Sequence, residues 1–285
     1  MTKNNNDQPI IVAFVADLFF STRIDKVAQH LNYTVHWIEN EAQFQQADDP
    51  APANPRPGES ISGPTHRLMD QLTQWQPALL IFDLSAQEIP WRRWLPRLKS
   101  SPATRRIPVL AFGAHVDTET FAEARSLGAD SVVARSRFST GMLDLIQNLA
   151  NPTDHQALFD TCQQPLSDLA KKGIEAYNAG QFYDAHEHLE HAWQEDSSVG
   201  RELYRGILQV AVAYYQISRG NYRGAVKMCL RARQWLDPLP DQCRTINIAQ
   251  LRQEFETNYQ TITDLGPDNL DKFDLSTIQP IPIVP

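Results

Sequence analysis

The stretch PALLIFDLS, residues 77–85, decides the fold of the first half of this chain. Its apolar run ends in Asp83, and a short continuous apolar run is typical of a parallel strand that is buried on both faces. Residues 10–17, IIVAFVAD, repeat the pattern and end in Asp17. The two runs therefore predict two buried strands, each of which ends in an aspartate.

Strand-like and helix-like periods alternate five times over residues 1–150. Alternation of this kind predicts an α/β domain with a doubly wound, parallel, five-stranded sheet. The expected strands are 10–16, 34–38, 78–82, 109–112 and 131–134, and the expected helices are 21–31, 66–75, 91–98, 118–127 and 139–149.

Three segments of this half resemble a response-regulator receiver domain: PALLIFDLS, IPVLAFGA at 107–114 and GADSVVARS at 128–136. The resemblance implies that acidic side chains gather at the carboxyl ends of the strands, where open α/β sheets bind ligands. It also implies a Mg²⁺ ion held by those carboxylates, and a hydroxyl and a lysine that contact the phosphoryl group. Asp83 stands at the position of the phosphate-accepting aspartate.

The pocket that the resemblance implies is incomplete in this sequence. Asp17 is the only acidic residue at the end of its strand, because Ala16 precedes it. Gly113 stands where a hydroxyl residue is expected, and Arg135 stands where a lysine is expected, with a different geometry. We therefore predict a pseudo-receiver, in which Asp17 and Asp83 bind Mg²⁺ weakly at most. Two alternatives stay open: Asp83 is a working phosphoacceptor, or it only caps a loop.

Proline distribution divides the chain. Five of the 19 prolines lie between Pro50 and Pro64, whereas none lies between Pro165 and Pro238. The first pattern indicates an extended insert, and the second is typical of packed helices. We predict a receiver-like domain at 1–150 with an insert at about 41–65, a linker at 151–165, an all-helical domain at 166–265 and an extended, proline-spaced tail at 266–285.

The helical half contains an internal repeat. Gly180-Gln-Phe-Tyr-Asp-Ala185 recurs as Gly220-Asn-Tyr-Arg-Gly-Ala225. In each copy we expect the glycine to end one helix and the alanine to lie where the next helix packs closely. The repeat predicts two helical hairpins, and residues 248–265 are expected to form a fifth helix that covers them.

Spaced residues on two of these helices resemble the signature of a bacterial and archaeal helical family, domain of unknown function 309. The string is His186-x3-Glu190-x2-Trp193-x9-Leu203-x2-Gly206-x2-Gln209. The resemblance covers about residues 166–240, and Leu203 departs from the usual aromatic residue of the family. It implies an all-α bundle and no established activity.

His186, Glu190 and Gln209 form a candidate polar site beside Trp193. One interpretation is a metal- or small-ligand-binding, enzyme-like site. The helix lacks the HExxH pattern, however, and His186 with Glu190 supplies two ligands where catalytic zinc needs three. The other interpretation is a hydrogen-bonded network that fixes the helix register.

Basic residues recur every four positions at Arg219, Arg223, Lys227 and Arg231, which predicts a charged stripe on one helix face. No acidic residue occurs between Glu202 and Asp237. A solvated or salt-bridged face is one interpretation, and a surface for an anionic partner is the other.

Composition limits the class of protein. The 285 residues include 26 basic and 34 acidic side chains, for a net charge of −8, which argues against a general binder of nucleic acids or membrane surfaces. No apolar run approaches the length of a transmembrane helix. The three cysteines at 162, 229 and 243 predict no disulfide framework and favour a reducing cytoplasm.

We therefore predict a cytoplasmic, non-enzymatic signalling or adaptor protein that acts through protein–protein contacts. The degenerate receiver domain offers a surface that phosphate does not gate, and the helical domain is the docking or effector module. The alternatives are a ligand- or metal-binding enzyme centred on His186, Glu190 and Gln209, and a true phosphorelay receiver that uses Asp83.

Overall fold

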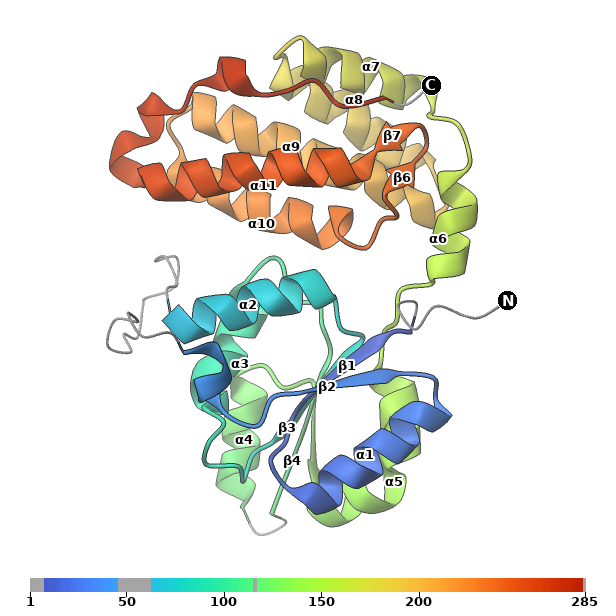
Figure 1. Cartoon of the computed structure of the whole chain (residues 1–285), viewed down its shortest axis with the longest axis vertical. Helices are drawn as coiled ribbons and strands as arrows, with labels where there is room; N and C mark the ends of the chain where they lie inside the picture. The colour runs from blue at the N-terminus through green and yellow to red at the C-terminus, as the bar shows by residue number, and fades with distance from the viewer. Residues whose placement is uncertain (1–7, 46–62, 115–116, 284–285) are drawn as a thin grey trace. The chain divides into compact units, whose positions relative to one another are not determined.

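The computed structural model describes residues 8–45, 63–114 and 117–283. The chain divides into two compact units, Met1–Thr153 and Asp154–Pro285, which are described separately (Figure 1). Most of the proline-rich insert expected at about 41–65 lies outside the described residues. Its first part forms a short 3-10 helix, Glu41–Phe44.

The first unit contains the five-stranded parallel sheet that the sequence predicts. The strand order is β2-β1-β3-β4-β5. From β1, the chain adds β2 on one side of the sheet and then β3, β4 and β5 on the other. In sheets of this kind, ligands bind in the crevice at the carboxyl ends of the strands where the order changes, here β1 and β3. The strands are β1 Ile10–Phe14, β2 Thr34–Trp37, β3 Leu79–Asp83, β4 Val109–Gly113 and β5 Ser131–Ala134.

Helices cover both faces of this sheet (Figure 1). One apolar cluster joins the sheet to α1 and α5, and a second joins it to α2, α3 and α4. The helices are α1 Leu18–His30, α2 Gly63–Trp75, α3 Trp91–Ser100, α4 Thr118–Ser126 and α5 Arg135–Leu149.

Helix α2 begins at Gly63, earlier than the sequence pattern predicts, and the two helices that supply residues of the candidate site also begin early. Helix α1 begins at Leu18 because the Asp17 carboxylate accepts a hydrogen bond from the Phe19 N–H and caps the helix. Helix α5 begins at Arg135, four residues before the expected start, and bends at Gly141. The shift of α5 matters for the candidate site, because it places Arg135 at the first residue of a helix.

The aromatic and basic cluster at the start of α3 is packed and paired. Trp91 and Trp94 are both buried. Arg92 pairs with Glu123 at 2.8 Å, and Arg93 pairs with Glu41. These contacts account for the cluster as part of the fold of this unit.

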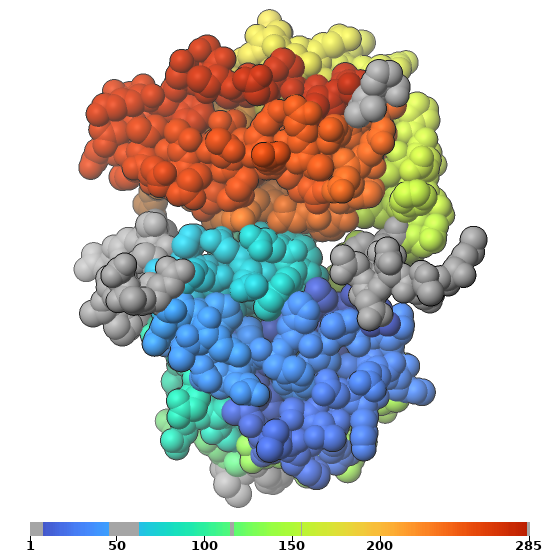
Figure 2. All heavy atoms as spheres, viewed as in Figure 1, coloured from blue at the N-terminus to red at the C-terminus, as the bar shows by residue number. Residues whose placement is uncertain are grey.

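The second unit is a helical bundle with one apolar core. In Figure 2, α11 and the C-terminal tail form much of the visible face of this unit. Its helices are α6 His155–Cys162, α7 Asp168–Asn178, α8 Phe182–Glu195, η3 Val199–Arg201, α9 Glu202–Ser218, α10 Tyr222–Leu236, α11 Ile248–Leu265, η4 Pro267–Lys272 and η5 Leu275–Thr277, and a two-stranded β6 Gln242–Cys243 and β7 Ile246–Asn247 precedes α11.

The repeat forms the two predicted hairpins, α7–α8 and α9–α10. Gly180 and Gly220 occupy the connecting turns with φ of 73° and 68°, a left-handed conformation that favours glycine. Ala185 and Ala225 are fully buried in the following helices. The fifth helix, α11, has the predicted bounds.

Two stretches differ from the sequence expectation. The expected linker at 151–165 contains helix α6, because Asp154 caps it and Leu158 is buried in the core of the second unit. The expected extended tail begins with two short 3-10 helices, η4 and η5, and its end pairs with β7 through an isolated bridge from Ile283 to Ile246.

The expectation that the cysteines form no disulfide is wrong. Cys162 and Cys243 are bonded and join the end of α6 to β6. Their sequence separation of 81 hid the pairing, because a residue count does not show which side chains the fold brings together. Disulfides are rare in reducing compartments, so the cysteine count no longer supports a cytoplasmic location. Cys229 is free and buried, and burial raises the pKa of its thiol to about 12.

No helix among the described residues combines the length and the apolar character needed to cross a bilayer.

Candidate functional site

Asp83 lies at the carboxyl end of β3, and its two carboxylate oxygens have different partners. Oδ2 accepts a hydrogen bond from the Arg135 guanidinium at 2.8 Å, and Oδ1 accepts one from the Ser85 N–H at 2.9 Å. The Asp83 side chain is only 2% exposed. The carboxylate is therefore paired with a fixed cation and held by the backbone of the following loop.

Arg135 reaches this position from the first turn of α5. Its guanidinium carbon also lies 5.4 Å from the centroid of the Phe20 ring, which comes from α1. The side chain is 38% exposed, whereas its partner Asp83 is buried. The ion pair thus ties β3 to α5 at the edge of the sheet, with Phe20 beneath the cation.

The other predicted residues of this pocket do not complete a metal site. Asp17 is partly buried, and its carboxylate caps α1. Gly113, the last residue of β4, is buried, and a Cβ atom there would lie 3.1 Å from the Phe121 ring. A hydroxyl residue at this position would therefore require Phe121 to move. His115, which follows β4 in the sequence, lies outside the described residues.

Two large apolar side chains next to Asp17 were not anticipated as surface residues. Leu18 is 80% exposed and Phe19 is 60% exposed. They occupy the first two positions of α1, immediately after the strand end that supplies Asp17. The Arg23 guanidinium lies 5.4 Å from the Phe19 ring centroid, and Arg23 also donates a hydrogen bond of 2.6 Å to the Ser139 carbonyl of α5.

The polar group of the helical unit brings together fewer partners than its sequence spacing suggests. The His186 Nε2 atom lies 3.7 Å from a Glu190 carboxylate oxygen, and both side chains are partly exposed. Among the described residues, no three His, Cys, Asp or Glu side chains gather closely enough to hold a metal ion. The Trp193 indole N–H and the Gln209 side-chain carbonyl are buried atoms that have no hydrogen-bond partner in the described part of the chain.

The predicted basic stripe is divided between two helices. Arg219 is the C-cap residue of α9, whereas Arg223, Lys227 and Arg231 belong to α10. The stripe was assigned to one helix because the four-residue spacing continues across the turn at Gly220. Arg223 and Lys227 are exposed.

A buried polar network around Arg244 was missed by sequence reasoning. Arg244 is 4% exposed and lies 2.7 Å from the Asp196 carboxylate. It also donates hydrogen bonds to Ser198, at 2.9 Å, and to the Tyr204 hydroxyl. Burial alone raises the pKa of Asp196, but hydrogen bonds from Ser198 and the charge of Arg244 outweigh it and hold that pKa below its ordinary value.

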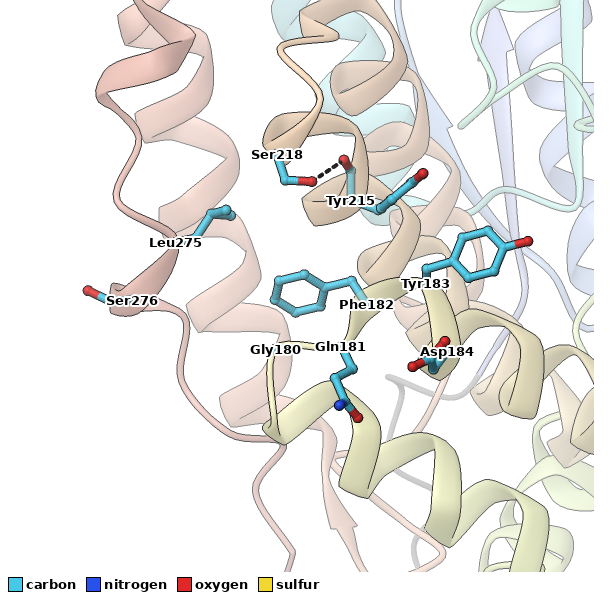
Figure 3. Close-up of a pocket in the computed structure, with 9 residues that line it drawn as sticks. All are labelled: Gly180, Gln181, Phe182, Tyr183, Asp184, Tyr215, Ser218, Leu275 and Ser276. Carbon is cyan, nitrogen blue, oxygen red and sulfur yellow. Dashed lines mark hydrogen bonds between the residues drawn. The ribbon is translucent and has the colours of Figure 1, made fainter.

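A hollow of about 470 Å³ lies where the α7–α8 turn, the end of α9 and the tail meet. Figure 3 shows the Phe182 ring pointing toward Leu275 of the tail, whereas Tyr183 points away from it. The Ser218 hydroxyl donates a 2.7 Å hydrogen bond to the Tyr215 carbonyl. Asp184 is the only charged residue among the nine that line the hollow.

The molecule is thus a two-unit protein, in which a receiver-like α/β unit precedes an all-helical unit. Residues 170–228, in the helical unit, match the family model described as "Domain of unknown function (DUF309)". A protein of Aquifex aeolicus (strain VF5), described as "Uncharacterized protein", is 30% identical over 92 residues, which are 32% of this chain and 27% of that protein. The matched segment therefore spans only about a quarter of that relative.

Solved receiver domains resemble the first half of the chain. A putative response regulator from Chloroflexus aurantiacus J-10-fl is 15% identical, with a TM-score of 0.37, and the match covers 50% of this chain and 97% of that one. A signal receiver domain from Bermanella marisrubri is 17% identical, with a TM-score of 0.37, over 51% of this chain and 100% of that one. The strand order, and not these scores, defines the fold of the first unit.

Proposed function

We propose that this chain is a non-enzymatic signalling or adaptor protein whose receiver-like unit works without phosphorylation of Asp83. The helical unit serves as its docking module. The observation that carries the proposal is the ion pair between the buried Asp83 carboxylate and Arg135, at 2.8 Å.

Three features of the pocket support a site that phosphate does not gate. Both oxygens of the Asp83 carboxylate already have partners. The Arg135 guanidinium neutralises the charge that a Mg²⁺ ion would otherwise balance, and Asp17 is the only other carboxylate expected at this edge. Finally, Gly113 has no hydroxyl with which to bind a phosphoryl oxygen, so a phosphorylated Asp83 would lack that contact.

A chemical phosphorylation assay tests this proposal. The full-length protein is incubated with acetyl phosphate and Mg²⁺, and phosphoprotein is quantified by intact mass spectrometry. We expect no phosphoryl adduct above the level of the Asp83→Asn variant. An adduct that forms stoichiometrically and disappears in Asp83→Asn would show that the chain is a working receiver.

The arrangement around His186 gives no comparable support to an enzyme. Two potential ligands, His186 and Glu190, lie at 3.7 Å, and the described residues supply no third acidic, histidine or cysteine ligand.

A further inference from the structure

Contacts at both ends of α8 and α9 fix how these antiparallel helices face each other. The rings of Tyr183 and Tyr215 lie 5.5 Å apart at one end. At the other end, the Arg205 guanidinium lies 4.7 Å from the Trp193 ring centroid. This register places Glu190 of α8, three residues before Trp193, at the level of Gln209 of α9, four residues after Arg205.

The register between α9 and α10 is fixed in the same way. The Arg205 guanidinium lies 3.9 Å from the Trp235 ring centroid. Near the other end of the pair, a Cβ atom on Gly224 would lie 3.0 Å from the Gln216 side-chain oxygen. This register places Arg231 and Gln209 at the same level, one turn in from Trp235 and Arg205.

Helix α9 therefore carries one accessible strip between α8 and α10. Residues of its opposite side, including Ile207, Val210 and Tyr214, are fully or almost fully buried in the core. The accessible strip is partly exposed along its length. We call it the α9 face; it consists of Arg205, Gln209, Val212 and Gln216, with Glu190 of α8 on one border and Lys227 of α10 on the other.

The two borders of the α9 face have opposite charge. Glu190 lies on the α8 border, where Glu187 and Asp184 follow on the outer side of the same helix. On the α10 border, Arg223 and Lys227 are exposed, and no ion pair among the described residues involves either of them. Helices α9 and α10 contain no acidic residue after Glu202, so the basic border has no acidic neighbour on its own hairpin.

We propose that the α9 face binds an acidic peptide segment of a partner protein. Carboxylates of the segment lie against Lys227 and Arg223, and a backbone N–H of the segment donates a hydrogen bond to the side-chain carbonyl oxygen of Gln209. Gln209 supports this assignment because its carbonyl oxygen has no hydrogen-bond partner among the described residues, and a buried acceptor without a partner is costly. Gln209 as a whole is partly exposed on the α9 face, within reach of a segment that binds there.

Charge favours a short acidic segment over a nucleic acid. A nucleic acid carries a continuous row of phosphates, and the carboxylates of Glu190, Glu187 and Asp184 along α8 would repel such a row. A peptide places its charges on one side and neutral amides on the other, which matches a face with one basic border. The inference rests on the proposed docking role of the helical unit and does not depend on the state of Asp83.

Selection from a library of random dodecapeptides tests the proposal with the full-length protein as bait. We expect the enriched peptides to contain more Asp and Glu than the input library. A labelled copy of the most enriched peptide is then titrated by fluorescence anisotropy. The proposal is overturned if no peptide is enriched, if the enriched peptides are not acidic, or if a single-stranded RNA of equal charge displaces the peptide at lower concentration.

Variants locate the binding surface. Lys227→Glu should weaken binding about fivefold, from loss of an attractive charge and gain of a repulsive one, and Gln209→Leu should weaken it by a similar factor. Lys172→Glu makes the same charge change on an exposed residue of α7, and we expect less than about a twofold effect. Equal weakening by Lys172→Glu and Lys227→Glu would show non-specific attraction and refute the assignment.

A final arm separates this inference from the proposed function. Binding of the labelled peptide should be the same for wild-type protein, for Asp83→Asn and for protein treated with acetyl phosphate and Mg²⁺. Affinity that changes with phosphorylation of Asp83 would contradict the proposed function but leave the binding surface in place. If Lys227→Glu and Gln209→Leu do not weaken peptide binding, the α9 face is not the binding surface, and the result for Asp83 is unaffected.

Discussion

Reduction of the Cys162–Cys243 bond should strongly destabilise the helical unit. The bond closes a loop with a sequence separation of 81 that contains α7, α8, α9 and α10. The loop-closure relation gives ~4.5 kcal/mol for a loop of this length, and measured values generally fall below that limit. We expect a loss of about 3–4 kcal/mol in the free energy of unfolding.

Hydrogen–deuterium exchange measures this loss within one unit of a two-unit protein. Both cysteines are buried, at 4% and 0% exposure, so the protein is reduced in urea and refolded with and without reductant. The slowest amides of α9 should exchange about 100- to 1,000-fold faster in the reduced protein. Amides of β3 in the first unit serve as the internal control and should not change.

Two controls make the result decisive. Thiol titration of the unfolded, unreduced protein should find one thiol, Cys229, and reduction should raise the count to three. The Cys162→Ala/Cys243→Ala variant should exchange at the same rate with and without reductant. The reasoning is refuted if reduction raises the thiol count and leaves exchange in α9 unchanged.

Three further predictions concern the helical unit. Burial raises the pKa of Asp237 to about 7 from its ordinary value of 3.8, so the folded state holds this proton more tightly and the free energy of unfolding falls as pH rises between these values. In urea titrations, Asp237→Asn should therefore be more stable than wild type at pH 8, by on the order of 1 kcal/mol, and the difference should shrink toward pH 4. The control variant Asp271→Asn, on the exposed surface, should show no such trend. Arg244→Gln leaves the partly buried Asp196 carboxylate without its cation and should lower the free energy of unfolding by about 3 kcal/mol. The control Arg252→Gln should lower it by about 1 kcal/mol or less. Equal shifts of the urea midpoint in the two variants would contradict this difference. Gly180→Ala places a side chain at a φ of 73° and should cost about 1 kcal/mol, which a thermal melt would register as a lower Tm; an unchanged Tm would argue against a left-handed turn.

Local sequence patterns predicted the elements better than the contacts between them. The apolar runs that end in Asp17 and Asp83 gave the sheet, since a buried parallel strand has a continuous apolar signature. The repeated glycines at 180 and 220 gave the two hairpins, because a left-handed turn favours glycine. Helix starts were less predictable. The Asp17 cap is a local hydrogen bond from the Phe19 N–H, which the apolar pattern alone does not show, whereas Arg135 at the first position of α5 contacts Asp83 of β3.

Pairings across long separations were not accessible to the same reasoning. The spacing of Cys162 and Cys243 carries no signal that the end of α6 meets β6. The same holds for Arg244, a basic residue that sequence alone places on the surface, although its partner Asp196 lies in another loop. The polar site and the basic stripe looked like separate features, and only the register of α8, α9 and α10 places Glu190, Gln209 and Lys227 along one face.

The central claim is that the Asp83 pocket does not respond to phosphate. Nuclear magnetic resonance of the isotope-labelled full-length protein tests it directly, with Mg²⁺ and beryllofluoride as a phosphoryl mimic. We predict that the amide signals of Asp83, Ser85, Gly113 and Arg135 stay in place during the titration. Saturable shifts of these signals that Asp83→Asn abolishes would contradict the claim.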